Sequence, residues 1–264
     1  MSVLIVIPAR YASTRFPGKP LVPLRGATGE AKSLIRRSWE AACAVPGARV
    51  IVATDDARID AHARGFGAEV VMTSSACRNG TERCAEVARI LDHHDIIVNL
   101  QGDAPLTPPW FVQDLVAGLR GAAMMDVATP VLRSDGAHLA GLIEDRRAGR
   151  VGGTTAVAAP DGRALYFSKE VIPYTGQDYA PDAPTPVFHH VGVYAYRPAA
   201  LAAYAEWAPG VLEQLEGLEQ LRFLEHGAPV LCVEVESRGR AFWEVNNPED
   251  VPRVEAMLAR TGIA

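Results

Sequence analysis

Residues 3–20 read VLIVIPARYASTRFPGKP, and this stretch decides the fold. Val3 to Ile7 (VLIVI) is a continuous run of apolar, mostly β-branched residues, which is typical of a strand buried on both faces of a parallel sheet. The run ends at Pro8 and passes into a loop rich in Arg, Lys, Gly and Pro. In an open α/β sheet, ligands bind where loops leave the carboxyl ends of the strands. The stretch therefore predicts a first strand followed directly by a ligand-binding loop.

The alternation of strands and helices continues toward the middle of the chain. Apolar residues recur at helical spacing, and short β-branched runs separate the helices. We expect helices over 31–45, 55–65 and 81–93, and strands over 49–53, 69–72 and 95–100. Strands that alternate with helices imply a parallel sheet with right-handed crossovers.

The second half of the chain has a less regular pattern. We expect helices over 110–119 and 211–226, strands over 125–133, 154–159, 164–168, 187–196 and 230–235, and an irregular stretch over 134–153. A last helix is expected to start at Asn247, with Pro248 in its first turn and acidic residues near the positive end of its dipole. The prediction is one α/β domain over residues 1–264, in three layers around a mostly parallel sheet, with a small β-rich insertion at about 120–200.

Length, composition and charge exclude several classes of protein. A chain of 264 residues that is 48% apolar and 22% charged buries a core without a structural metal or disulfide. A net charge of −5 opposes nucleic-acid binding. The sequence has no apolar run of about 18 residues and no signal peptide, so we expect a cytoplasmic protein with no membrane partner. The four cysteines form no CxxC pair and are expected to be reduced, non-catalytic thiols: Cys43, Cys77, Cys84 and Cys232.

The loop after the first strand has the composition of a polyphosphate site. Arg10, Arg15 and Lys19 supply charge-assisted contacts, and Gly18 lets backbone amides approach phosphate oxygens. The alternative is a solvated basic loop. The loop contains no GxxxxGK[ST] motif, and the absence of GxGxxG disfavours a dinucleotide-binding dehydrogenase.

Two further segments lie at positions where chemistry is expected. Asp103 in Gln101-Gly102-Asp103 follows an expected strand, and a carboxylate that faces a triphosphate usually holds Mg²⁺. Asp103 could equally cap the next helix, and the spacing alone does not decide. The segment Asn79-Gly80-Thr81-Glu82-Arg83 either holds a base or ribose or simply caps a helix.

Taken together, eight ordered segments resemble the 3-deoxy-manno-octulosonate cytidylyltransferase family, the CMP-Kdo synthetases that activate an acidic sugar for lipopolysaccharide. The segments are PARYASTRFPGKPL, VATDD, NGTERCAEV, IIVNLQGDAP, ALYFSKEVIP, HHVGVYAYR, LEQLEGLEQLR and VNNPED. They cover nearly the whole chain. The resemblance implies a nucleotide-diphospho-sugar transferase-like fold, a homodimer formed through the insertion, and Mg²⁺-dependent transfer of CMP from CTP to the anomeric hydroxyl of an acidic sugar.

The resemblance also implies roles for individual residues. The first loop would hold the CTP phosphates through Arg10, Ser13, Arg15 and Lys19. The cytidine would be placed by the backbone of Pro8 and Ala9 and by Asn79, Gly80, Thr81 and Arg83. Asp103 would be a magnesium ligand, and the sugar acid would contact Gln101, His190, Tyr194, Glu213 and Glu216. His190 could instead be an ordinary hydrogen-bonded histidine, and Tyr194 and Glu216 could be packing and surface residues.

Two positions depart from the family pattern. Asn246 stands where the family commonly has the Asp of VDTPED, so an amide replaces a metal-binding carboxylate. Thr155 aligns near a family Lys. Losing an anion and a cation together points to a changed acceptor pocket. Two alternatives follow: a cytidylyltransferase for another acidic sugar, an amino-sugar analogue or a phosphonate, and a nucleotide-binding protein without activity.

Overall fold

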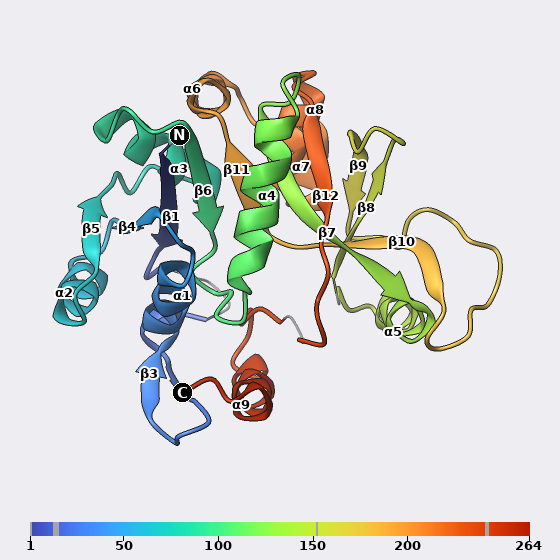
Figure 1. Ribbon diagram of the computed structural model, residues 1–264, viewed down its shortest axis with the longest axis horizontal. Coiled ribbons are helices and arrows are strands. Elements are labelled where there is room, and N and C mark those ends of the chain that lie inside the picture. Colours follow the sequence, from blue (N-terminus) through green and yellow to red (C-terminus); the bar gives the residue numbers. More distant parts are fainter. Residues whose placement is uncertain (1, 13–15, 152, 241–242) are drawn as a thin grey trace. The chain divides into compact units, whose positions relative to one another are not determined.

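The computed structural model describes residues 2–12, 16–151, 153–240 and 243–264 (Figure 1). The chain forms two compact units, of which unit 1 comprises Met1–Gln113 and Ser237–Ala264, and unit 2 comprises Asp114–Glu236. Helix α4 (Pro109–Gly121) begins in unit 1 and ends in unit 2. A search of the described residues finds no helix with the length and apolar character needed to cross a membrane.

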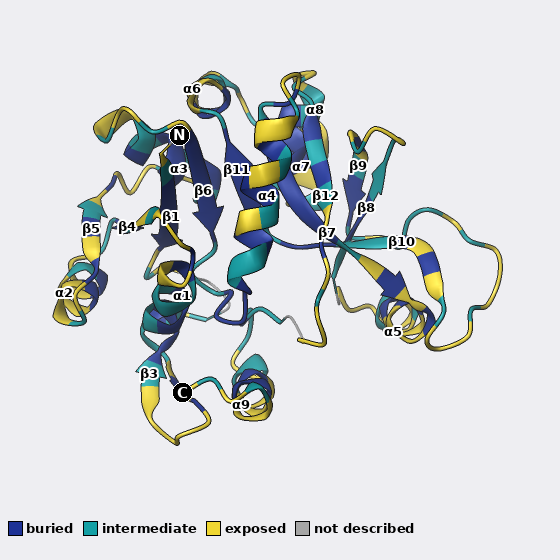
Figure 2. Cartoon of the chain, viewed as in Figure 1, coloured by how far each residue is buried: buried dark blue, intermediate teal, exposed yellow. Residues whose placement is uncertain are grey.

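Unit 1 is built on a four-stranded parallel sheet in the order β5-β4-β1-β6. The strands are β1 (Val3–Ala9), β4 (Ala48–Thr54), β5 (Glu69–Met72) and β6 (Ile96–Leu100). Every residue of β6 is buried, and so are the last six residues of β1 (Figure 2). The continuous apolar runs of the sequence therefore form strands covered on both faces, as predicted.

Three capped helices connect the strands of unit 1. They are α1 (Leu34–Cys43), α2 (Ala57–Gly65) and α3 (Gly80–Ile90), and the side chains of Ser33, Asp56 and Asn79 accept hydrogen bonds at their starts. Because crossovers are right-handed and the strand order reverses after β5, α1 and α2 lie on one face and α3 on the other. The reversal places a topological switch point between β1 and β6, where such sheets bind ligands.

The ends of unit 1 differ from the prediction in two places. Ala31–Ser33 was expected to be helical but forms a strand, β3, which pairs antiparallel with β2 (Pro23–Arg25). A single 3₁₀ turn, η1 (Lys19–Leu21), precedes β2. The last helix, α9 (Asp250–Thr261), starts three residues later than expected. The carboxylate of Asp250 accepts hydrogen bonds from the backbone of the two preceding asparagines, so Asn247 is not the cap.

Unit 2 is a mixed sheet organised around one long strand, β7 (Val127–Asp135). β7 pairs antiparallel with β10 and β11 and parallel with β12, and β8 pairs antiparallel with β10 and β9. The bounds are β8 (Thr154–Ala158), β9 (Ala164–Ser168), β10 (Pro184–His190), β11 (Val193–Tyr196) and β12 (Val230–Glu234). The single strand expected over 187–196 is therefore two strands, because the chain bends at Val191, whose carbonyl accepts from the amide of Val193.

Two predictions in unit 2 were wrong. The stretch expected to be irregular contains α5 (Gly136–Arg147), which buries only Gly136, Leu139 and Leu142 and so lacks a broad apolar face. The helix expected over 211–226 is interrupted at Gly217, whose φ of 62° ends α7 (Val211–Glu216) before α8 (Leu221–Glu225) begins. α6 (Pro198–Glu206) completes the unit.

Candidate functional site

The described part of unit 1 brings two of the predicted catalytic residues into contact. The Lys19 ammonium donates to Asp103 Oδ2 at 2.6 Å and to the carbonyl of Val245 at 3.0 Å. The side chains of Lys19 and Asp103 keep 18% and 22% exposure, so the pair is partly buried but reachable. Asp103 binds Lys19 and lies six residues before the first residue of α4. The structure thus joins the first loop, the end of β6 and the segment before α9.

The backbone holds Asp103 in place from both sides. Ser38 of α1 donates its hydroxyl to the carbonyl of Gly102 at 3.0 Å, and the amide of Val245 donates to the carbonyl of Asp103 at 3.0 Å. A Cβ on Gly102 would lie 2.9 Å from the carbonyl oxygen of Pro8, so this position requires glycine. The Asp103 carboxylate is therefore presented by a rigid turn.

The oxygens around the Lys19 ammonium are of the type that Mg²⁺ prefers. The Asp103 carboxylate and the Val245 carbonyl are hard oxygen donors that already surround one positive charge. Among the described residues, no three or more His, Cys, Asp or Glu side chains gather in a metal-binding cluster. A divalent cation held here would therefore need further oxygens from a bound ligand, and the residues present fit an ion that binds together with a polyphosphate.

The first loop is described only in part. Ser13 and Arg15, which were expected to bind phosphates, lie outside the described residues. Arg10 is exposed, whereas Pro8 and Ala9 are buried. The loop closes through a hydrogen bond of 3.0 Å from the amide of Gly18, which has a φ of 70°, to the carbonyl of Tyr11. The exposed Arg10 side chain is thus available to an anion at this edge of the sheet.

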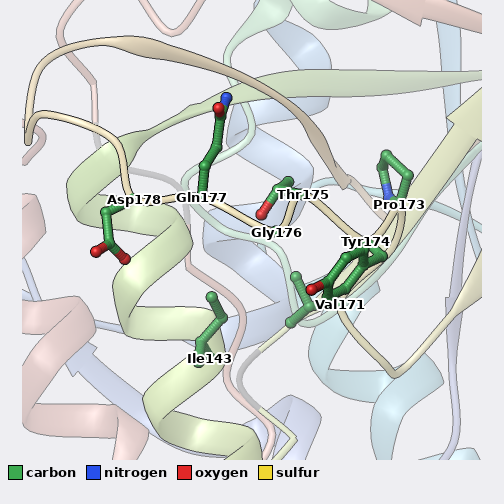
Figure 3. A pocket seen from close by; sticks show the side chains of 8 residues that line it. All are labelled: Ile143, Val171, Pro173, Tyr174, Thr175, Gly176, Gln177 and Asp178. Atoms are coloured by element: carbon green, nitrogen blue, oxygen red, sulfur yellow. The ribbon is translucent and has the colours of Figure 1, made fainter.

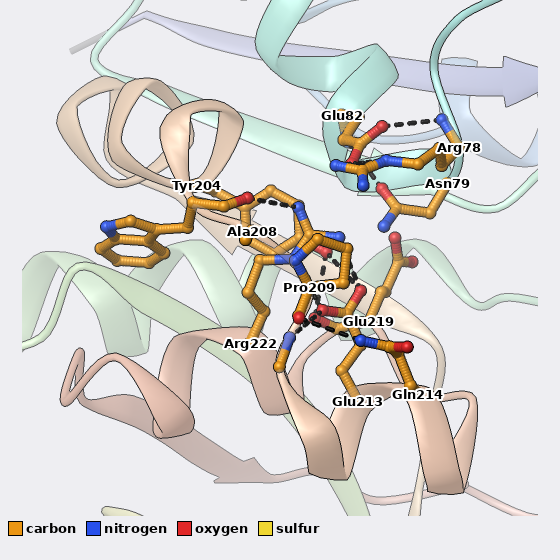
Figure 4. Close-up of polar contacts among 12 residues, drawn as sticks. Arg78, Asn79, Glu82, Tyr204, Ala208, Pro209, Glu213, Gln214, Glu219 and Arg222 are labelled. Atoms are coloured by element: carbon orange, nitrogen blue, oxygen red, sulfur yellow. Dashed lines mark hydrogen bonds and ion pairs between the residues drawn. The ribbon is translucent and has the colours of Figure 1, made fainter.

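The start of α3 is a polar turn against the same sheet. Asn79 Oδ1 accepts from the amide of Glu82 at 2.8 Å, and Glu82 in turn binds the side chain and backbone of Arg78 (Figure 4). Thr81 and Arg83 are buried. The Arg83 guanidinium donates to Thr73 and lies 3.5 Å from Asp55 Oδ1. Arg83 therefore anchors α3 to the loops after β4 and β5.

In unit 2, two predicted acceptor residues are hydrogen-bonded to buried polar side chains. His190 Nε2 lies 2.9 Å from Thr129 Oγ1, which itself lies 2.8 Å from the Val193 carbonyl. Thr129 donates its one proton to that carbonyl and accepts from His190, so Nε2 carries the imidazole proton. The Tyr194 hydroxyl donates to Gln220 Oε1 at 3.0 Å. In the ligand-free protein, His190 is therefore a buried, hydrogen-bonded histidine, which is the alternative to a role in acceptor binding.

Burial lowers the pKa of His190 to about 3, and the neighbouring His189 adds to the shift. As the pH is lowered through 6.5, the histidine of the unfolded chain gains a proton that the folded protein does not bind. The free energy of unfolding therefore decreases as the pH is lowered. Between pH 7.5 and 5.5, His190 alone should remove about 1.4 kcal/mol from the free energy of unfolding. Urea unfolding at the two pH values should show this loss reduced in His190→Asn and unchanged in His93→Asn, a control at an exposed histidine. Equal losses in wild type and His190→Asn would contradict the assignment.

The two predicted acidic residues of α7 are already engaged. Glu213 forms a bidentate ion pair with the buried guanidinium of Arg222, with both N···O distances at 2.7 Å (Figure 4). Glu216 accepts from the Ser168 hydroxyl at 2.6 Å and from the amide of Lys169 at 2.9 Å. Both carboxylates fix the position of α7 in the ligand-free protein.

Thr155, the second departure from the family pattern, is also a structural contact in this chain. Its hydroxyl donates to the carbonyl of Glu170 at 2.6 Å and accepts from the amide of Ile172 at 3.2 Å. The side chain is fully buried in β8. The hydroxyl therefore ties β8 to the segment after β9.

A separate hollow of about 360 Å³ lies in unit 2 beside α5 (Figure 3). Its lining contains none of the residues predicted from the sequence and consists of Ile143, Val171, Pro173, Tyr174, Thr175, Gly176, Gln177 and Asp178. We assign it no role in the chemistry.

The sequence analysis missed three groups that contact the predicted site residues Lys19, His190 and Tyr194. The Val245 carbonyl left no signal, because any residue provides a backbone oxygen. Thr129 and Gln220 are buried polar partners of the predicted histidine and tyrosine. A polar residue within an otherwise apolar strand, as in Val127-Ala128-Thr129, was the available sequence signal.

Comparisons with known proteins agree with this geometry. Residues 4–235 match the protein family described as cytidylyltransferase. The chain is 45% identical over 264 residues to the 3-deoxy-manno-octulosonate cytidylyltransferase of Maricaulis maris, with 99% of each chain covered. It is 38% identical to the Zea mays enzyme of the same name, covering 98% of this chain and 81% of the other.

A solved structure extends the agreement to the fold. CMP:2-keto-3-deoxy-manno-octonic acid synthetase complexed with CTP matches with a TM-score of 0.83 at 35% identity, over 99% of this chain and 100% of the other. This match confirms the predicted α/β nucleotidyltransferase-like fold. With relatives this similar over the whole chain, the protein belongs to the 3-deoxy-manno-octulosonate cytidylyltransferase family.

Proposed function

We propose that this protein transfers CMP from CTP to the anomeric hydroxyl of 3-deoxy-manno-octulosonate and releases pyrophosphate. The observation that carries the proposal is the contact between Lys19 and Asp103 at the carboxyl edge of the unit 1 sheet. A cation and a carboxylate held together are the pair that a metal-bound triphosphate needs. Membership of the family adds the nucleotide and the acceptor.

The reaction is an in-line displacement at phosphorus. The anomeric oxygen forms a bond to the α-phosphorus of CTP, the bond from that phosphorus to the α–β bridging oxygen breaks, and the hydroxyl proton is lost to solvent. Asp103, the Val245 carbonyl and the Asn246 side chain would hold Mg²⁺. The ion would stabilise negative charge at the α-phosphate and would lower the pKa of the attacking hydroxyl.

The cations of the first loop act on the leaving group. Lys19 exchanges Asp103 for a phosphate oxygen when CTP binds, and the exposed Arg10 adds a second positive charge. The resemblance adds Ser13 and Arg15 to the same task. This rigid, charged edge stabilises the negative charge that builds up on pyrophosphate, which is the main electrostatic demand of the reaction.

The resemblance assigns the acceptor to residues that include His190 and Tyr194 of unit 2. His190 is neutral above pH 5 because of its lowered pKa, so it offers the sugar acid a hydrogen bond rather than a charge. The Tyr194 hydroxyl, which donates to Gln220, is a second polar group assigned to the acceptor. Glu213 and Glu216 are proposed to act by holding α7, since other side chains and amides already bind their oxygens.

An assay of pyrophosphate release with CTP and a panel of acceptors tests the proposed acceptor. The panel contains 3-deoxy-manno-octulosonate, its 8-amino analogue, another acidic sugar and a phosphonate. The proposal predicts the highest kcat/KM for 3-deoxy-manno-octulosonate. Faster release with any other member would shift the assignment to that acceptor.

Asn246 favours one second candidate, a nucleotide-binding protein without activity. The amide brings no charge to a site where the family has a carboxylate. Calorimetric titration with CTP separates the candidates, because heat of binding without pyrophosphate release over the whole panel would support the inactive protein.

The exchange Asn246→Asp should strengthen the metal site. The neighbouring Val245 carbonyl already faces the Lys19 ammonium, so a carboxylate at 246 adds a charge next to Asp103. With CTP present, the Mg²⁺ concentration for half-maximal activity should fall on the order of tenfold. Asn247→Asp, which adds the same charge one residue further on, should change it less than about twofold. An unchanged Mg²⁺ requirement in Asn246→Asp would place residue 246 outside the metal shell.

A cytoplasmic homodimer completes the proposal. All four cysteines are free, and burial raises the pKa of Cys77 to about 11 and that of Cys232 to about 12, so these thiols stay protonated and suit a reducing compartment. The insertion at about 120–200, to which the resemblance assigns the dimer contact, exposes large apolar side chains: Met124, Val151, Leu165 and Tyr174.

A further inference from the structure

Asn99 is a fully buried amide in the middle of an otherwise apolar strand, β6. Among the residues that the structure describes, neither its Oδ1 nor its Nδ2 has a hydrogen-bond partner. Leaving a buried donor and acceptor unpaired destabilises the folded state, so an orphan of this kind requires an explanation. Proteins tolerate such costs mainly where function needs them.

The Asn99 amide points toward the start of α3. In the register of β1 and β6, Asn99 lies opposite Val6, so Asn99 and Gln101 share a face with Pro8. A Cβ on Gly80, the first residue of α3, would lie 2.9 Å from Asn99 Nδ2, 3.0 Å from Gln101 Nε2 and 3.3 Å from Pro8 Cγ. Two amides and a proline ring therefore converge beside a glycine, at the switch point of the sheet.

The chemistry of these groups suits a planar base and not a phosphate. None of them carries a charge, and the proline ring offers an apolar wall. A side-chain amide presents one donor beside one acceptor, which matches an edge that has an acceptor next to an amino group. Cytosine has this edge in N3 and the 4-amino group.

We propose that Asn99 is a specificity-determining residue for the donor nucleotide, and that its amide binds the N3 and 4-amino edge of the cytosine of CTP. The inference rests on the proposed function. Gln101, whose amide lies beside the same glycine, is partly exposed, so the pair of amides extends from the buried Asn99 toward the surface. Base binding then supplies the partners that Asn99 lacks in the ligand-free protein.

The test compares two ligands in two proteins by calorimetry without acceptor. The ligands are CTP and the CTP analogue in which hydrogen replaces the 4-amino group, and the proteins are wild type and Asn99→Leu. Wild type should bind CTP about tenfold more tightly than the analogue. Asn99→Leu should bind both ligands equally and melt about 2–4 °C higher, because a buried orphan has been removed.

Thr107→Val is the matched control. Its hydroxyl is also buried in unit 1 but donates to the Ala104 carbonyl at 3.0 Å, so its removal should lower the melting temperature and leave the preference for CTP intact. If Asn99→Leu still prefers CTP over the analogue, the proposal is overturned. If its melting temperature falls, the Asn99 amide is not an unpaired group in the ligand-free protein. Should Asn99→Leu fail to fold, Asn99→Ser undergoes the same comparison. Wild type that neither binds nor turns over CTP would instead refute the proposed function.

Discussion

Replacement of Asp103 by Asn is expected to lower kcat/KM by about 1,000-fold, which corresponds to roughly 4 kcal/mol of transition-state stabilisation. The substitution keeps the shape of the side chain and removes the charge that we propose holds Mg²⁺. The amide oxygen can still accept a hydrogen bond from Lys19, and the backbone bonds to Asp103 and Gly102 are unaffected. Activity therefore falls while the fold remains.

The thermal melt separates this role from a structural one. The ion pair with Lys19 is partly exposed, and such pairs contribute about 1 kcal/mol or less, so the melting temperature of metal-free Asp103→Asn should change by less than about 3 °C. Asp92→Asn, an exposed carboxylate in the same unit, should retain full activity. Unfolding of Asp103→Asn would show that the carboxylate serves the fold, and near wild-type turnover would remove it from the metal site.

Lys19→Ala is expected to lower kcat/KM with CTP by about 30- to 150-fold, through the loss of one charge-assisted contact worth about 2–3 kcal/mol. The same change has an opposite effect on metal binding. In the ligand-free protein, the Lys19 ammonium neutralises Asp103 at 2.6 Å. Removing the ammonium frees the carboxylate, so Mn²⁺, used as a paramagnetic substitute for Mg²⁺, should bind more tightly to nucleotide-free Lys19→Ala than to wild type.

Electron paramagnetic resonance of Mn²⁺ measures this second effect without turnover. Lys32→Ala is the matched control, because Lys32 also forms a partly buried ion pair, with Glu40 at 3.0 Å, but does not contact Asp103. It should leave both activity and Mn²⁺ affinity within about twofold of wild type. Wild-type rates in Lys19→Ala would refute the phosphate contact, and unchanged Mn²⁺ affinity would refute the role of Lys19 as a counter-ion.

The sequence predicted unit 1 well because burial alone determines its strands. VLIVI is apolar throughout and DIIVNL is apolar apart from Asp95 and Asn99, and such runs have few alternatives to a strand covered on both faces. The N-cap Asn79, one of the two alternatives for its segment, likewise acts locally, within three residues of its partner. The hairpin of β2 and β3 was missed because its three-residue strands are too short to show a period.

Unit 2 was harder because its elements depend on contacts distant in sequence. Helix α5 has no clear apolar stripe, and the β10–β11 bend depends on pairing of both strands with β7. For the site, Lys19 and Asp103 were identified together, but the Val245 carbonyl that joins them is 226 residues from Lys19 and has no side-chain signature. The resemblance supplied residue roles, whereas the structure alone showed that Arg83 and Glu213 are already paired.

Phosphorus NMR of a reaction of CTP with 3-deoxy-manno-octulosonate and Mg²⁺ tests the central claim most directly, because it identifies which phosphorus–oxygen bond breaks. Nucleotidyl transfer predicts one new phosphodiester resonance, from CMP joined to the sugar acid, together with an equal amount of pyrophosphate. Formation of CDP with phosphate or a phosphorylated sugar, or no reaction at all, would contradict it.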